Sequence, residues 1–259
     1  MKYTVITGAS SGIGYETALA FAARGKNLII VARRLDKLEE LKSKIQDSHS
    51  DVDVIIRTSD LSDTANSYKL YENLKEYQVE TWINNAGLGE SSSVSDQSLK
   101  KVESMLRLNI ESLTILSTLF VRDYSHVEGT QLINVSSALG YATYIGSITY
   151  SASKYFVSAF TEGLAKELEL KSAKMKAKVL APAVTETEFE KTAQDVEEFD
   201  YKNFMPMYHT AKQMAGFMME LYDNDKVVGI VDESYNFNLR DQIYPIKRSN
   251  LSNTRRLMY

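Results

Sequence analysis

Cysteine is absent from this chain of 259 residues, and histidine occurs only three times, at His49, His126 and His209. Without cysteine the chain has no disulfide, thiolate zinc site, iron–sulfur cluster or cysteine nucleophile. The three histidines do not pair at the spacing of metal ligands. We therefore predict no metal site. A cysteine-free chain suits the cytoplasm, and we expect a cytoplasmic protein.

Strong net charge and long hydrophobic runs are also lacking. Thirty Lys plus Arg against 34 Asp plus Glu give a formal charge of −4, which is mild and of the wrong sign for binding nucleic acid or an anionic membrane. The longest aliphatic runs, such as residues 28–32, are far shorter than the roughly 20 residues of a membrane span. The chain also runs from Met1 into a strand-like segment with no sign of a signal peptide. We expect a small-molecule partner, not nucleic acid or a membrane.

Proline is scarce, at Pro182, Pro206 and Pro245, and no linker rich in Pro, Gly or Ser divides the chain. Short apolar runs alternate with amphipathic segments up to about Pro182, which indicates a parallel sheet covered by helices on both faces. We predict one doubly wound α/β domain over residues 1–259, with a core at 1–182 and a flap and C-terminal region at 183–259. Strands are expected at residues 3–7, 27–32, 52–58, 81–84, 130–135 and 176–181, and helices at 13–24 and 36–45.

A glycine-rich turn follows the first predicted strand. Residues 7–14 read TGASSGIG and lead directly into a helix, whose free amides and positive end attract phosphate. Glycines permit the tight turn and the close approach of a pyrophosphate, although the first gap is one residue wider than in the usual dinucleotide motif. We interpret the turn as part of a dinucleotide site. The residues assigned to it are Gly8, Ser10, Ser11, Gly12, Ile13 and Gly14.

The end of the second predicted strand discriminates between NAD and NADP. An acidic side chain there holds the ribose 2′-hydroxyl, but this chain has Arg33 and Arg34. A guanidinium binds a 2′-phosphate through its forked donors, so we predict NADP(H), with Arg33 as the main contact and Arg34 beside it. The alternative is that Asp36, about 20 residues past the glycines, holds the ribose 2′-hydroxyl, which would favour NAD. With Glu39, Asp36 looks instead like a helix cap and its reciprocal glutamate.

A tyrosine four residues before a lysine places both side chains on one helical face, where an ammonium stabilises a phenolate. Of several such pairs, Tyr150/Lys154 alone begins a helix after the predicted strand at 130–135, whose end carries Ser136 and Ser137. Ligands bind at the carboxyl ends of such strands, so we place this pair near the cofactor. The other pairs are Tyr71/Lys75, Tyr208/Lys212 and Tyr222/Lys226.

These motifs together resemble the classical short-chain dehydrogenase/reductase family over about residues 7–189, which implies a Rossmann-like fold. The turn matches the family's cofactor turn, and Asp60 and Leu61 match the acidic position beside the adenine. Residues 84–87 match the segment that steadies the fourth strand and flanks the adenosine ribose, through Asn85, Ala86 and Gly87. Pro182 precedes Ala183 where the family usually has glycine, and Thr187 matches the threonine at the nicotinamide. The catalytic tetrad falls on Asn109, Ser137, Tyr150 and Lys154.

The chemistry implied is hydride transfer between NADP(H) and a carbonyl or alcohol carbon, with Tyr150 as general acid or base. We expect Lys154 and an oxidised nicotinamide to lower the pKa of Tyr150 from its ordinary value near 10. Lowering that pKa by three units would require about 4 kcal/mol of interaction free energy. Ser137 holds the substrate oxygen in line. The resemblance gives Asn109 the positioning of a water that connects Lys154 to solvent. It implies Ser137, not Ser136, because the family places that serine thirteen residues before the tyrosine.

Alternatives remain at the level of the substrate and the assembly. A 3-oxoacyl-carrier reductase is one, although Glu233, Ser234 and Tyr235 stand where those enzymes usually have Asp-Gly-Gly. A non-catalytic NADP-sensing regulator is another. The segment around Asn109 is apolar on most sides, and the resemblance suggests that it and the helix from Tyr150 pack against a second subunit in a homodimer or homotetramer. Burial within one subunit is the alternative.

The stretch after Pro182 forms a mobile flap in the resembling family. Residues 183–200 hold seven carboxylates against Lys191, a charge of −6, which is expected to repel anionic substrates or simply to be solvated. We expect an uncharged, moderately apolar carbonyl or alcohol substrate. The apolar side chains expected to fold inward are Val184, Phe189, Phe199, Phe204, Met205 and Met207, with Tyr141 and Tyr144.

Overall fold

A computed structural model describes residues 1–247 of the chain as an α/β fold built on one eight-stranded sheet. The strand order is β10-β9-β6-β5-β4-β1-β2-β3, and all neighbours pair in parallel except β9 and β10. The strands are β1 (Lys2–Thr7), β2 (Asn27–Ala32), β3 (Val54–Thr58), β4 (Gln78–Asn84), β5 (Gln131–Val135), β6 (Lys176–Ala181), β9 (Val228–Val231) and β10 (Phe237–Arg240). The order reverses between β1 and β4, which is where such sheets bind ligands.

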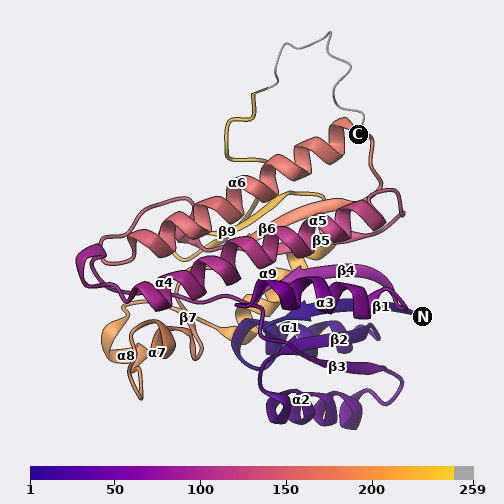
Figure 1. Ribbon diagram of the computed structural model, residues 1–259, viewed down its shortest axis with the longest axis horizontal. Coiled ribbons are helices and arrows are strands. Elements are labelled where there is room, and N and C mark those ends of the chain that lie inside the picture. Colours follow the sequence, from indigo (N-terminus) through magenta and orange to yellow (C-terminus); the bar gives the residue numbers. More distant parts are fainter. Residues whose placement is uncertain (248–259) are drawn as a thin grey trace.

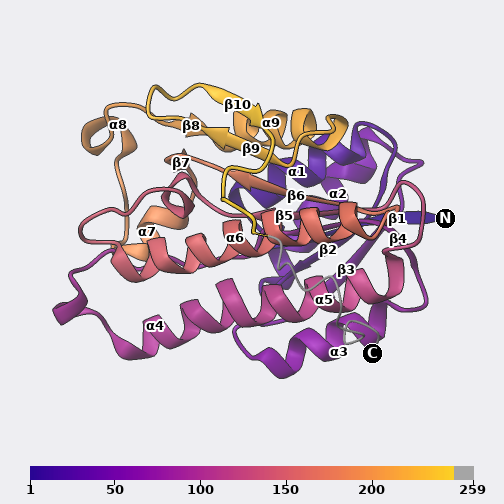
Figure 2. The same ribbon diagram turned by 90° about the horizontal axis from the view of Figure 1, so that it is seen from above.

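Helices cover both faces of this sheet (Figure 2). One face carries α1 (Gly12–Ala22), α2 (Leu35–Ser48) and α9 (Ala211–Asp223), and its core includes Phe21, Leu41 and Met218. The other carries α3 (Thr64–Leu74), α5 (Leu113–Tyr124) and α6 (Ile148–Leu170), around Trp82 and Phe120. Two buried apolar faces explain why the strands are almost continuously hydrophobic.

Short elements complete the chain between these layers. They are η1 (Val94–Asp96), α4 (Leu99–Leu106), η2 (Arg107–Ser112, a π-helical turn), η3 (Ala138–Gly140), β7 (Thr185–Glu186), α7 (Phe189–Ala193), α8 (Tyr201–Phe204) and β8 (His209–Thr210). β7 and β8 form a separate pair of parallel strands. In Figure 1, α7 and α8 lie on the side of the molecule opposite the N-terminus.

The predicted strands agree with the structure within a few residues, and two match completely, at residues 27–32 and 176–181. The first helix, predicted to run to residue 24, ends at Ala22, and Gly25 takes a left-handed conformation (φ +69°) in the turn that follows. The expectation that the alternation fades after Pro182 was wrong. After an irregular flap, α9 and β9 continue it, and β9 pairs in parallel with β6.

The helical run Leu99–Tyr124, formed by α4, η2 and α5, is long and apolar enough to cross a membrane by length and composition alone. Core helices of globular proteins pass the same test. Here Met105, Leu116 and Phe120 are fully buried in the protein, and about two-fifths of the most apolar window is buried. We therefore describe the run as a packing helix of the α/β fold.

Candidate active site

A cleft of about 1150 Å³ opens at the carboxyl ends of the parallel strands. The turn after β1, the ends of β2, β4 and β5, the start of α6 and the flap all contribute to its walls. The structure thus brings together segments that are far apart in the sequence. The predicted site residues that line the cleft are Gly8, Ser10, Ser11, Gly12, Ile13, Arg33, Arg34, Asp60, Leu61, Asn85, Ala86, Gly87, Ser137, Tyr150, Lys154, Pro182 and Thr187.

Gly14 was predicted in the cofactor turn but lies behind the cleft wall. A Cβ at this position would stand 2.4 Å from both the Gly8 carbonyl oxygen and the Asn85 Nδ2. Glycine is therefore required by the contact between the turn and the end of β4. Gly8 and Gly12 have φ values of +70° and +57°, which favour glycine, and they leave the backbone of the turn open to the cleft.

Hydrogen bonds fasten the turn to the end of β4. The backbone amides of Asn85 and Ala86 both donate to the Thr7 Oγ1 at 3.0 Å, and the Asn85 Nδ2 donates to the Thr7 carbonyl oxygen at 3.0 Å. Asn84 belongs to a different network, in which it accepts from the Trp82 indole and donates to Asn134. These bonds hold the two central strand ends in register at the switch point.

The two arginines after β2 face different neighbours. The Arg34 Nη2 donates to the hydroxyls of Ser10 (3.1 Å) and Ser11 (3.0 Å) in the turn. Arg33 is exposed and lies near Asp60. Burial acts to raise the pKa of Asp60, but hydrogen bonds from Ser62 and the charge of Arg33 lower it overall. The guanidinium that reaches the turn is thus that of Arg34, not that of Arg33.

The expected helix cap at Asp36 was wrong. Helix α2 begins at Leu35 with Arg34 in the N-cap position, and Asp36 lies in the first turn. Its negative charge still suits the positive end of the helix. Asp36 is exposed and does not line the cleft, so it is not placed to bind the ribose.

Helix α6 supplies both members of the predicted catalytic pair. Lys154 is only 5% exposed, and its Nζ donates to the Val135 carbonyl oxygen at 3.0 Å, at the end of β5. The same Nζ lies 5.8 Å from the centre of the Tyr150 ring. Burial lowers the pKa of Lys154 from 10.5 to about 8. An ammonium at the edge of its titration range therefore stands beside the tyrosine.

The pKa of Tyr150 is raised in the protein itself, contrary to the expectation that Lys154 depresses it. Burial is the main cause, the charge of Glu190 adds to it, and the hydroxyl of Ser137 opposes it. Lys154, whose Nζ donates to the Val135 carbonyl oxygen, does not offset this shift. The positive charge of an oxidised nicotinamide is not part of this balance.

The two serines after β5 have different surroundings. The Ser136 hydroxyl is buried between α6 groups: it donates to the Lys154 carbonyl oxygen (2.9 Å) and contacts the Ser158 hydroxyl (2.7 Å). The Ser137 hydroxyl accepts from the Leu139 amide at 3.1 Å and lines the cleft beside Tyr150. This geometry favours Ser137 over Ser136 as the partner of a substrate oxygen.

Asn109 lies in the π-helical turn η2, behind the cleft wall, and is 1% exposed. Its amide pairs with the Leu88 backbone in both directions (3.0 and 2.9 Å) and donates to the Ser153 hydroxyl. A Cβ added to Gly87 would lie 3.4 Å from the Asn109 Oδ1 and 3.5 Å from the Lys154 Nζ. Asn109 is thus adjacent to Lys154, and π-helical turns often occur at functional sites.

The other tyrosine–lysine pairs lie outside the residues that line the cleft. Tyr71 is buried and donates to the carboxylate of Asp123. Tyr208 packs on Tyr201, and Tyr222 packs on Phe21. All four pairs have the same spacing. Tyr150 is therefore distinguished from the other three tyrosines by the position of its helix, which follows β5 and begins at the cleft.

Several side chains of the flap line the cleft. The Phe189 ring lies 5.5 Å from the Tyr150 ring and presses on Gly89, where a Cβ would come within 2.6 Å of it. Ala183 has no left-handed conformation, so alanine fits this turn without strain.

Of the other apolar residues predicted to fold inward, Val184, Met205, Tyr141 and Tyr144 line the cleft as expected. The inward placement of three other residues was wrong: Phe204 and Met207 are 71% and 47% exposed, and Phe199 packs on Tyr201 and Phe204.

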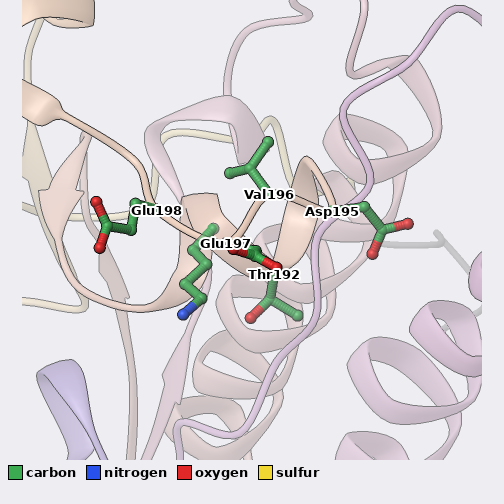
Figure 3. A pocket seen from close by; sticks show the side chains of 6 residues that line it. Thr192, Asp195, Val196, Glu197 and Glu198 are labelled. Carbon is green, nitrogen blue, oxygen red and sulfur yellow. The ribbon is translucent and has the colours of Figure 1, made fainter.

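A shallow hollow of about 640 Å³ lies on the outside of the flap, lined by Thr192, Asp195, Val196 and neighbouring residues (Figure 3). The side chains of Asp195 and Glu198 point in opposite directions there. Asp195 pairs with Lys101, which also lies 3.9 Å from the buried carboxylate of Glu90. None of the predicted catalytic residues lines this hollow. The acidic face of the flap is thus in part solvated and in part engaged in ion pairs.

Sequence reasoning missed Glu162, which lies two turns beyond Lys154 on α6. Its buried carboxylate accepts from the Tyr141 hydroxyl (2.7 Å) and from the backbone amides of Ile243 (2.5 Å) and Tyr244 (2.9 Å). The Tyr244 hydroxyl donates to the Gly140 carbonyl oxygen, and its ring stacks on Tyr141. The C-terminal segment therefore braces the loop that begins at Ser137. Helical spacing from Lys154 (i+8) was the available signal, but nothing in the local sequence indicates the partners of Glu162.

Comparisons with known proteins agree with this geometry. The family model described as short chain dehydrogenase matches residues 2–198. The sulfoacetaldehyde reductase of Chromohalobacter salexigens is 36% identical over 191 residues, which cover 71% of this chain and 72% of that protein.

Two solved structures have the same architecture. A short-chain dehydrogenase from Sphingobium yanoikuyae in complex with NADPH is 28% identical, with a TM-score of 0.81 over 89% of this chain and 87% of that one. The bulky-bulky ketone specific alcohol dehydrogenase of Comamonas testosteroni is 26% identical, with a TM-score of 0.77 over 89% and 86%. The fold, the glycine turn and the family match show that this chain belongs to the short-chain dehydrogenase/reductase family, whose members are nicotinamide-dependent oxidoreductases.

Proposed function

We propose that this protein is an NADP(H)-dependent oxidoreductase that transfers a hydride between the nicotinamide and a carbonyl or secondary alcohol carbon. One observation carries the proposal. Ser137, Tyr150 and Lys154 line the same cleft as the glycine turn, and Asn109 and Lys154 both lie beside Gly87. A protein that only binds a nucleotide needs the turn but not this constellation.

The residues present fit a dinucleotide. The turn from Gly8 to Gly12 leaves its backbone open to the cleft, and the N-terminus of α1 directs amides there, as a pyrophosphate requires. Arg33 and Arg34 would hold the 2′-phosphate, and Asp60 and Leu61 would flank the adenine. The bound cofactor would supply or accept the hydride. The residues on the nicotinamide side would include Pro182 and Thr187.

The chain's own residues would handle the proton. In carbonyl reduction, the raised pKa keeps the Tyr150 hydroxyl protonated, so that it can donate to the developing alkoxide. Ser137 would hold the substrate oxygen by a hydrogen bond, and the Phe189 ring, which packs against Tyr150, would exclude water from the reacting atoms. In the reverse direction the phenol must lose its proton, which the Lys154 ammonium would favour. Asn109 would hold the backbone at Leu88 in place through its side-chain amide. We also assign to Asn109 the positioning of a water molecule that connects Lys154 to solvent.

The cofactor preference is expected to depend on both arginines, with Arg34 contributing through the turn. Replacing Arg34 with alanine should weaken NADPH binding about tenfold or more, because a charge-assisted contact to phosphate is lost, and should leave NADH binding nearly unchanged. Arg33→Ala should show the same selectivity. Fluorescence titration of both cofactors against each variant measures this. Equal losses for NADPH and NADH, or tighter NADH binding by the unmodified protein, would contradict the assignment.

For the substrate we propose an uncharged, moderately apolar aldehyde, ketone or secondary alcohol. Val184, Phe189 and Met205 contribute apolar surface to the cleft, and the flap carries excess negative charge. The ketone specificity of the Comamonas dehydrogenase supports this class. The sulfoacetaldehyde reductase favours a second candidate, an anionic aldehyde, and Arg240 in the cleft wall offers a cationic anchor for it.

Salt dependence separates the two substrate classes. With a neutral ketone and a carboxylate of similar size, kcat/KM should favour the ketone at low salt, and the difference should shrink as salt screens the flap. A carboxylate that is preferred at low salt, with the preference fading at high salt and in Arg240→Ala, would establish the anionic alternative.

The remaining assignments are proposals on the family resemblance. Ile148 and Phe156 leave α6 partly exposed and apolar, at 42% and 38%, and we propose that this helix and the run Leu99–Tyr124 pair with a second copy in a homodimer or homotetramer. A cytoplasmic location is proposed with them.

An assay of NADPH absorbance with ketones, aldehydes, 3-hydroxy acids and acyl thioesters distinguishes a carbonyl reductase from a 3-oxoacyl-carrier reductase. Activity with none of them favours the NADP-sensing regulator.

A further inference from the structure

The flap places a carboxylate on the arginine assigned to the cofactor phosphate. The Glu188 Oε2 lies 2.8 Å from the Arg34 Nη2, although 154 residues separate the two in sequence. The same Nη2 donates to the hydroxyls of Ser10 and Ser11, so a guanidinium, two hydroxyls and a carboxylate form one cluster at the edge of the turn. This contact joins the substrate flap to the cofactor turn.

Neighbouring contacts hold the backbone of Glu188 close to the turn. The adjacent Thr187 packs on Gly12, where a Cβ would lie 2.9 Å from the Thr187 Cγ2. The Tyr201 hydroxyl donates to the Thr187 carbonyl oxygen at 3.1 Å. Hydrogen bonding to Arg34 keeps the pKa of Glu188 below its ordinary value, so the carboxylate is charged at neutral pH. Glu188 is therefore an anion held at a defined place.

A 2′-phosphate would seek the same donors. It carries about −1.5 to −2 charges at neutral pH and accepts several hydrogen bonds, whereas a carboxylate carries −1. Two anions at one guanidinium repel each other, and the more highly charged one gains more from it. The ribose 2′-hydroxyl of NAD(H) carries no charge and cannot displace a carboxylate in this way.

We propose that Glu188 is a specificity-determining residue that competes with the cofactor 2′-phosphate for Arg34, so that NADP(H) but not NAD(H) releases this end of the flap. The inference rests on the assignment of Arg34 to the phosphate. Phosphate binding is thereby coupled to the flap that bears Phe189, whose ring packs at a tilt against that of Tyr150. The cofactor that carries the phosphate would free the wall of the substrate pocket.

The test compares Glu188→Gln with Glu186→Gln. Both variants remove one negative charge from the same flap, but Glu186 is exposed and takes part in no ion pair within residues 1–247. Glu188→Gln should lower the Kd for NADPH about two- to fivefold, the range expected for losing a surface ion pair, and leave the Kd for NADH unchanged. Glu186→Gln should change neither affinity measurably.

Hydrogen–deuterium exchange supplies an independent readout. NADPH, but not NADH, should raise exchange at the flap amides of residues 186–200 in the unmodified protein, and Glu188→Gln should show raised exchange before any cofactor is added. Equal effects of the two glutamine variants on NADPH affinity, or weaker NADPH binding by Glu188→Gln, would overturn the inference. Arg34→Ala distinguishes the failure of the phosphate assignment from the failure of the competition. If Arg34→Ala leaves NADPH affinity intact, the assignment of Arg34 to the phosphate fails. If Arg34→Ala weakens NADPH binding but Glu188→Gln does not change it, only the competition is refuted.

Discussion

Phenylalanine at Tyr150 should abolish turnover while leaving NADPH binding largely intact. The change removes the hydroxyl that exchanges the proton and keeps the ring that packs against Phe189 at 5.5 Å. Loss of a positioned general acid or base typically lowers the rate by about 10²- to 10⁴-fold. Steady-state rates with any accepted ketone, together with a cofactor titration, separate the loss of chemistry from a loss of binding.

Three tyrosines offer matched controls, because each also precedes a lysine by four residues. Phenylalanine at Tyr71, Tyr208 or Tyr222 should leave kcat nearly unchanged, since none of them lines the cleft. Tyr71→Phe loses a hydrogen bond to Asp123 and should cost about 1 kcal/mol of stability without changing kcat. A control variant that damages kcat as much as Tyr150→Phe would refute the choice of the catalytic pair.

Methionine at Lys154 should eliminate activity and yet stabilise the fold near neutral pH. The pKa of this lysine is about 8 in the folded protein against 10.5 ordinarily, so folding disfavours its charged form. The shift of roughly 2.5 units corresponds to a penalty on the order of 3 kcal/mol. Below pH 8 the penalty is fully present, and it fades as pH rises from 8 toward 10.5. The gain from Lys154→Met should therefore be about 1 to 3 kcal/mol at pH 7, after the loss of the bond to Val135, and decline above pH 8.

Urea unfolding of both proteins across pH 6 to 10 measures this difference. Lys178 is the control, because burial also lowers its pKa to about 8 but its Nζ donates to three carbonyl oxygens at the end of α9. Lys178→Met leaves those carbonyls unpaired and should destabilise the fold. If Lys154→Met destabilises the protein at neutral pH, or its effect does not change with pH, then Lys154 carries no burial penalty and the account of its environment is incorrect.

Local chemistry made the cofactor half of the fold predictable from sequence. Alternating apolar runs and a glycine turn are short-range signals, and they located the strands at residues 27–32 and 176–181 without error. Tyr150, Lys154 and Ser137 could be named because they lie after the fifth predicted strand, whereas Asn109, in the middle of a helical run, was named only through the family resemblance.

What could not be predicted depends on contacts between distant segments. Arg33 and Arg34 are equivalent in a linear motif, and only the path of the chain after β2 directs Arg34 to the turn. The pKa of Tyr150 follows from burial among groups of the flap and of β5, which no spacing encodes. Glu162 likewise accepts from the amides of residues 243 and 244, which lie 81 and 82 positions away in the sequence.

Isotope transfer from the cofactor tests the central claim most directly. NADPH that carries deuterium at the transferable position of its nicotinamide is supplied to the purified protein with a neutral ketone, and the alcohol product is analysed by mass spectrometry. The account predicts one deuterium on the carbinol carbon for each NADPH oxidised, with labelled product formed about 10²- to 10⁴-fold more slowly by Tyr150→Phe. An alcohol product without deuterium, or labelled product formed at an unchanged rate by Tyr150→Phe, would contradict it.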